Sequence, residues 1–86
     1  MAKVSGTFSG TGQSSPWCGG NCVVVLSYAG NAVVAVEIYD DVNANWVALA
    51  THTNASFAGK YDGYGKTSMR LNCTAHTANV EYCVYT

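Results

Sequence analysis

Apolar and polar residues alternate with a period of two along most of the chain, which is typical of β-strands with one buried face. The alternation is clearest near the end, over residues Thr67–Thr74 and Val80–Tyr85, with a short polar break between them. We therefore expect one β-hairpin there. Its inward-facing residues are predicted to be Met69, Leu71, Cys73, Val80, Tyr82 and Val84.

Similar segments precede this hairpin. The run Cys22–Tyr28 is continuously apolar and rich in valine, which predicts a strand covered on both faces. Residues 10–20 are rich in glycine and serine and contain the one proline, so they are predicted to form a loop. The other predicted strands are Val4–Gly10, Ala32–Tyr39, Trp46–His52 and a short edge strand near Ser56–Tyr61.

Short strands separated by turn signals about every 8 to 12 residues indicate a small sandwich or barrel. We predict a single all-β domain over residues 1–86, a small antiparallel β-sandwich of Ig-like or jelly-roll-like type with about six or seven strands. Glu37 is expected to point outward. The predicted core contains Val34, Val36, Trp46, Leu71 and Val84.

Charge is scarce in this chain. Charged residues make up 10% of the sequence, and the formal net charge is −1. Four scattered basic residues do not provide the clustered phosphate contacts that nucleic acid requires. Either other proteins partly cover this weakly charged surface, or it is simply solvated.

No apolar run near the amino terminus suggests a signal peptide, and none is long enough to cross a membrane. We therefore expect synthesis in a cytoplasm, where thiols normally stay reduced. Four cysteines in a short chain are unusual there, unless the protein is later released into an oxidising medium. Cys18 and Cys22 flank two glycines and could close a disulfide, or one of them could pair with Cys83. The remaining alternative is that all four are small buried thiols.

The chain contains no convincing catalytic or metal motif. Asp41, Asn43 and Asn45 have the spacing that opens a calcium loop, but Trp46 and His52 occupy the positions that need glycine and glutamate. The cysteine spacing is not that of a zinc knuckle. We predict no enzymatic activity, no cofactor and no metal.

Three segments resemble small bacteriophage virion proteins. The first is the strand, aspartate-rich turn and tryptophan-led strand at residues 31–49, although Val42-Asn43-Ala44 replaces the Gly-Gly that those proteins often carry. The others are the opening at residues 3–14 and the ending at residues 69–82. The resemblance implies a structural protein of the virion, made in the host cytoplasm.

From this resemblance we expect a capsid decoration, or cement, protein that binds the outer face of the head shell. Its partners would be the major capsid protein or other virion proteins and further copies of itself, as a trimer or dimer, without nucleic acid or membrane. One alternative is a head–tail connector or tail protein, and another is a small carbohydrate-binding module using Trp17, Tyr61 and Tyr64. The predicted partner-binding residues are Lys3, Phe8, Trp17, Phe57, Tyr61 and Tyr64.

Overall fold

A computed structural model describes residues 3–18, 21–62 and 67–86; of Cys18 it describes only the backbone. Within these residues the chain forms β-strands and no helix, which confirms the predicted all-β class. The strands are β1 (Lys3–Phe8), β2 (Gly12–Gln13), β3 (Trp17–Cys18), β4 (Asn21–Tyr28), β5 (Ala32–Asp40), β6 (Asn45–Thr53), β7 (Phe57–Asp62), β8 (Ser68–His76) and β9 (Val80–Tyr85). The region predicted to be a loop at 10–20 thus contains two short strands.

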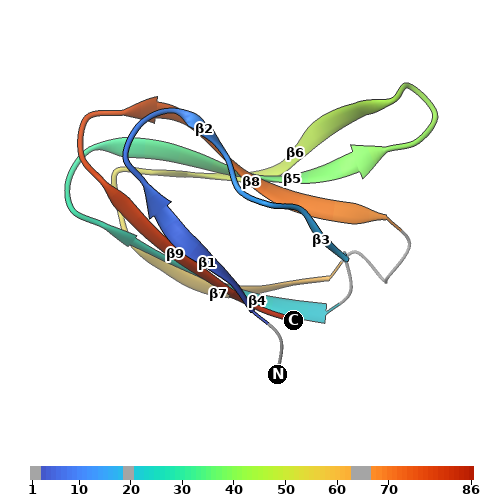
Figure 1. Cartoon of the computed structure of the whole chain (residues 1–86), viewed down its shortest axis with the longest axis horizontal. Coiled ribbons are helices and arrows are strands. Elements are labelled where there is room, and N and C mark those ends of the chain that lie inside the picture. The colour runs from blue at the N-terminus through green and yellow to red at the C-terminus, as the bar shows by residue number, and fades with distance from the viewer. Residues whose placement is uncertain (1–2, 19–20, 63–66) are drawn as a thin grey trace.

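The strands form two antiparallel sheets packed as a β-sandwich (Figure 1). The terminal sheet has the order β1-β9-β4-β7, and the hairpin sheet has the order β2-β8-β5-β6, with β3 also pairing with β8. The pairs are nested: β1 with β9, β2 and β3 with β8, β4 with β7, and β5 with β6. A long hairpin folded over in this way is a jelly roll, one of the two sandwich types that the sequence predicts.

The predicted carboxy-terminal hairpin does not form. β8 lies in the hairpin sheet beside β5, whereas β9 lies in the terminal sheet between β1 and β4. The predicted facing of the residues is nevertheless correct, because Met69, Leu71 and Cys73 are buried. Alternation reports which side of a strand faces the core, but it does not report which strand lies next to it.

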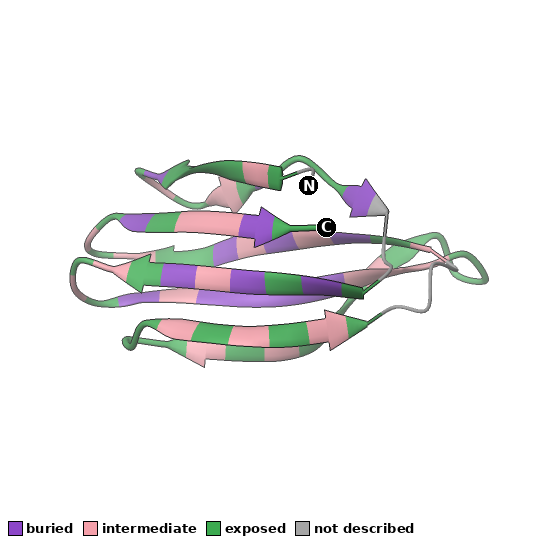
Figure 2. Ribbon diagram, turned by 90° about the horizontal axis from the view of Figure 1, so that it is seen from below, coloured by how far each residue is buried: buried purple, intermediate pink, exposed green. Residues whose placement is uncertain are grey.

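The core lies between the two inner faces, and buried and exposed residues alternate along the strands of the terminal sheet (Figure 2). Val34, Val36, Leu71 and Val84 are fully buried there, as the sequence suggests. Strand β4 is not covered on both faces, since Val23 on its outer side is 41% exposed. The largest completely buried side chains are Leu26, Met69, Leu71, Val24, Val34, Val36, Val80, Val84, Cys22 and Cys73.

Trp46 is half-buried and lies outside the core, which corrects its predicted position. The reason is a β-bulge between β5 and β6. Val36 pairs with Ala50, but its neighbour Glu37 pairs with Ala48, so Leu49 is an extra residue. An extra residue reverses which face the following side chains occupy. Trp46 therefore pairs with Tyr39 on the outer face of the hairpin sheet.

Aromatic rings lie over a glycine on each edge strand of the terminal sheet. A Cβ added to Gly6 would lie 2.7 Å from the hydroxyl of Tyr82, its cross-strand partner. At the opposite edge, the ring of Phe57 lies over Gly59, where a Cβ would overlap it. Each glycine thus leaves room for a ring that closes one side of the sandwich.

The β5–β6 hairpin extends beyond the rest of the molecule as an arm, residues 38–49 (Figure 1). Its pairing with β8 ends at Ile38, and beyond that point the two strands pair only with each other among the described residues. Asp40 holds the turn by accepting hydrogen bonds from Val42 N at 2.9 Å and Asn43 Nδ2 at 3.0 Å. These bonds lower the pKa of the Asp40 carboxyl, so the arm stays negatively charged at its tip.

Candidate interaction surfaces

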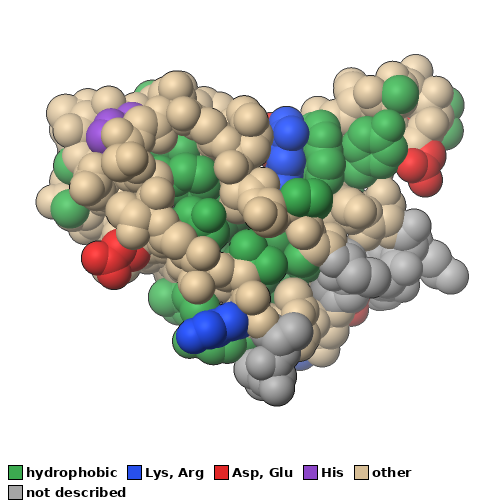
Figure 3. All heavy atoms as spheres, viewed as in Figure 1, with side chains coloured by type: hydrophobic (Ala, Val, Ile, Leu, Met, Phe, Trp, Pro, Cys, Tyr) green, Lys and Arg blue, Asp and Glu red, His purple; other side chains and the backbone are tan. Residues whose placement is uncertain are grey.

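The first surface is the free edge formed by β1. No described strand pairs with the far side of β1, which ends the terminal sheet. The strand is continuous over its six residues and carries no charge between Val4 and Phe8. The edge of the hairpin sheet that β2 and β3 form is different, because Ser14–Pro16 interrupts it between these two strands. Figure 3 views the molecule from the side of these edge strands.

Natural sheets usually protect a free edge with lysine, proline, a bulge or a covering segment. The Ser14–Pro16 break provides such protection for the hairpin sheet. β1 has a lysine only at its first residue, Lys3, and then presents Ser5 and Thr7 to solvent. The backbone of β1 is therefore open to pairing with a strand from another protein.

The second surface is the outer face of the terminal sheet. Strand register places Lys3, Tyr85, Val23 and Lys60 in one row across its four strands. The next row is Ser5, Cys83, Val25 and Ala58. Val23 is 41% exposed and Tyr85 is 39% exposed, so this face leaves large apolar side chains in water. Cys83 and Tyr85 are two residues apart on β9 and therefore lie side by side on this face. A hydrogen bond with the Cys83 thiol raises the pKa of the Tyr85 phenol.

The arm is the third surface. Val42 at its turn is 90% exposed, and Val47 and Leu49 on β6 are 47% and 48% exposed. The turn itself needs a left-handed backbone at Ala44, where φ is 53°. The sequence does not reveal these exposures, because β-branched and leucine residues normally indicate a buried strand face.

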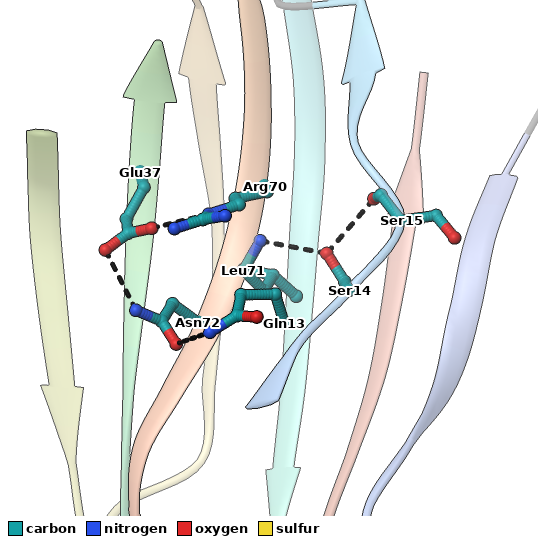
Figure 4. A network of polar contacts seen from close by, with 7 residues as sticks. All are labelled: Gln13, Ser14, Ser15, Glu37, Arg70, Leu71 and Asn72. Atoms are coloured by element: carbon teal, nitrogen blue, oxygen red, sulfur yellow. Dashed lines mark hydrogen bonds and ion pairs between the residues drawn. The ribbon is translucent and has the colours of Figure 1, made fainter. Parts of the chain in front are cut away.

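The outer face of the hairpin sheet is covered by its own side chains (Figure 4). Arg70 Nε donates to Glu37 Oε1 at 2.7 Å, and Asn72 Nδ2 donates to Glu37 Oε2 at 3.1 Å. Gln13 Nε2 in turn donates to Asn72 Oδ1 at 3.0 Å. Glu37 is only 9% exposed although it points outward, as predicted, because these neighbours lie over it.

Trp46 continues this cover. The Arg70 guanidinium lies 4.4 Å from the centroid of the Trp46 ring, and the Tyr39 ring meets Trp46 edge-on at 5.2 Å. Hydrophobic and basic side chains gather at the base of the arm in Figure 3. Arg70 thus binds a carboxylate and an aromatic ring at once, which a planar guanidinium does better than an ammonium group.

His52 joins the two sheets at the edge formed by β6 and β7. Its ring stacks on Phe57 with centroids 3.7 Å apart, and Nε2 lies 2.7 Å from the hydroxyl of Tyr61. Tyr28 donates a hydrogen bond to the carbonyl of His52. Burial lowers the pKa of the His52 imidazole, which favours its neutral form.

The cysteines do not form the predicted bridges. Cys22 is a free thiol, 2% exposed, whose side chain points into the core. Cys83 is also free and lies on the opposite, outer face of the same sheet, so it cannot reach Cys22. The side chain of Cys18 lies outside the described residues. Burial raises the pKa of the Cys22 and Cys73 thiols, as expected for cysteines that pack as small apolar residues.

Most of the predicted partner-binding residues serve the interior. Phe8 and Trp17 are each 6% exposed and belong to the core, so neither is available to a partner. Phe57 and Tyr61 are half-buried around His52. Lys3 is exposed, and Tyr64 lies outside the described residues.

The carbohydrate-binding alternative rests on Trp17, Tyr61 and Tyr64. Trp17 is buried, whereas Tyr61 lies in the cluster around His52 on β6. With Tyr64 undescribed, the aromatic residues chosen from the sequence do not form one exposed surface in the part of the chain that the structure covers.

Neither a metal-binding group nor a membrane span is found among the described residues. No group of three or more His, Cys, Asp or Glu side chains lies together in residues 3–18, 21–62 and 67–86. Over the same ranges, no helix has the length and apolar character to cross a membrane. No family model, curated protein or solved structure matches the chain.

Proposed function

We propose that the protein is a bacteriophage capsid decoration protein that binds subunits of the head shell through the free edge of β1. The resemblance of residues 3–14, 31–49 and 69–82 to small phage virion proteins supports the virion context. The unprotected β1 edge supports binding to another protein and carries the proposal.

Strand addition by a partner would explain why the backbone of β1 is left unpaired. A strand or extended segment of a shell subunit would continue the order of the terminal sheet beyond β1, with backbone hydrogen bonds supplying the affinity. The small side chains of Ser5 and Thr7 permit close approach and bring no charge that would have to be desolvated. A shell repeats its subunits many times, so modest affinity per copy is sufficient.

Binding to shells assembled without the protein tests this proposal. We expect the purified protein to cosediment with such shells and to raise their resistance to heat. Thr7→Lys should weaken binding about tenfold or more, because lysine on an edge strand opposes strand addition. Ser27→Lys is the matched control, since Thr7 and Ser27 flank Glu81 in one row but Ser27 lies on the internal strand β4.

Equal binding by the wild type and Thr7→Lys would reject the β1 edge as the contact. A second candidate, the head–tail connector or tail protein, uses the same edge for a different virion partner. Copy number separates the two: hundreds per particle indicate decoration, and about six or twelve indicate a connector or tail ring. If the wild-type protein does not bind empty shells and occurs only at the tail vertex, the head–tail connector or tail function replaces the decoration function.

A further inference from the structure

All the large hydrophobic side chains that are exposed among the described residues occur at two places. Val42, Val47 and Leu49 lie on the arm. Val23 and Tyr85 lie side by side on the outer face of the terminal sheet. Exposed apolar clusters of this kind mark protein contacts more often than scattered single residues do.

The arm and the row through Tyr85 and Val23 carry charges of opposite sign. Arg70 pairs with Glu37, and the other described basic residues, Lys3 and Lys60, stand at the two ends of the row that contains Tyr85 and Val23. The arm carries Asp40 and Asp41 at its turn and no basic residue. The acidic residues of the terminal face, Glu81 and Asp62, occupy other rows.

The arm and this face cannot meet within one chain. The arm continues the hairpin sheet past the end of its pairing with β8, and it points away from the terminal sheet (Figure 1). The outer face of the terminal sheet is turned to the opposite side of the sandwich (Figure 2). A contact between the two surfaces therefore requires a second molecule.

We infer that the arm of one copy packs on the outer face of the terminal sheet of a second copy. Val42 and Val47 contact Val23 and Tyr85, and Asp41 approaches the Lys60 end of the row. The contact is head-to-tail, so each copy offers one arm and one face, and a closed ring uses every surface. It leaves the β1 edge free and does not depend on binding to a shell.

The arm is small compared with the roughly 800 Å² per partner of a standard stable interface. Each single contact is therefore weak, and closure of a ring strengthens the assembly because each copy is held twice. We expect oligomers to form as the protein concentration rises. Sedimentation velocity over a wide concentration range measures this directly.

Charge exchange tests the pairing of the surfaces. Asp41→Lys and Lys60→Asp should each weaken self-association about tenfold or more, because each places like charges together. The two substitutions in one chain should restore most of the association, since every contact then regains opposite charges. Failure of the double variant to recover, while both single variants remain folded by near-ultraviolet circular dichroism, would overturn the inference.

Replacement of an apolar arm residue and alkylation of a thiol on the terminal sheet test the self-association independently. Val42→Asp should reduce association without affecting the fold, because Val42 is 90% exposed; Thr77→Asp, in the exposed β8–β9 turn, is the control. Alkylation of Cys83, followed by peptide mass spectrometry, should slow as oligomers form, because Cys83 lies in the row next to Tyr85 and Val23. A protein that stays monomeric, or that associates equally well as Val42→Asp with Cys83 still reactive, contradicts the proposed contact.

Discussion

The two outer faces of the sandwich differ in how they are covered. On the hairpin sheet, Arg70 and Asn72 bond to Glu37, which is 9% exposed, and the Arg70 guanidinium lies over the Trp46 ring. On the terminal sheet, Val23 and Tyr85 have no such cover and remain 41% and 39% exposed. Both sheets are antiparallel, but the pairing of β5 in the hairpin sheet is irregular, and the extra residue Leu49 brings Trp46 to that outer face. The difference therefore comes from the side chains and from this bulge.

The difference indicates which face is complete within one molecule. A carboxylate bonded to Arg70 and Asn72 has its hydrogen-bonding needs met without a partner, so covering it further brings little gain. An apolar row flanked by Lys3 and Lys60 gains free energy when another protein covers it, since burial removes apolar area from water. The open face is therefore the one we assign to self-association.

The largest effect is expected in the core that both sheets share. Leu26→Ala on the terminal sheet and Leu71→Ala on the hairpin sheet should each lower the free energy of unfolding by about 2–5 kcal/mol, because both side chains are fully buried. Urea unfolding measures both values. If either variant unfolds at the wild-type urea concentration, its sheet is not packed as described.

Substitutions on the outer face of the hairpin sheet should lower the free energy of unfolding more than substitutions on the outer face of the terminal sheet. Arg70→Ala should cost about 1–3 kcal/mol, because it leaves the Glu37 carboxylate short of a partner and uncovers Trp46. Gln13→Ala, at the exposed end of the same hydrogen-bond chain, should cost about 0.5 kcal/mol or less. Thermal unfolding of the two variants in parallel makes the comparison, and equal losses would mean that the network does not act through Glu37.

A smaller effect is expected where the two sheets meet at His52. Its pKa is lowered in the folded protein, so the unfolded chain binds the proton more readily. Stability should therefore decrease as the pH falls through about 6.5, the ordinary histidine value, and level off below the folded pKa. Urea midpoints at several pH values measure this loss; His52→Gln should remove it and His76→Gln should retain it, and the reverse pattern would assign the effect to His76.

Substitutions on the outer face of the terminal sheet should hardly change the stability of the monomer. Val23→Thr should change the free energy of unfolding by no more than about 0.5 kcal/mol, because the side chain is already partly in water. Val24→Thr, one residue further along β4 and fully buried, should cost about 1–3 kcal/mol for its unpaired hydroxyl. Chemical unfolding at low protein concentration tests the pair, and a large loss for Val23→Thr would show that this face is covered within the monomer.

Several parts of the fold and of the surfaces follow from the residues. Alternation correctly predicts the all-β class, the inward side of β8 and the outward position of Glu37. The hairpin around the Asp40 turn is also predictable, because Asp and Asn favour turns. The exposed arm and the Arg70–Trp46 contact are not, since valine, leucine and tryptophan have the same local signal in a core strand.

The sequence by itself determined that this chain forms short amphipathic strands and which side of most strands is apolar, because side chains alternate on every strand whatever its neighbours are. Only the tertiary structure decided that β8 and β9 belong to different sheets, since pairing depends on contacts between distant segments. It also decided the place of Trp46, which the extra residue Leu49 turns from the core side to the outer face. The open row beside Val23 is likewise visible only after folding, because burial depends on what the whole chain places above each residue.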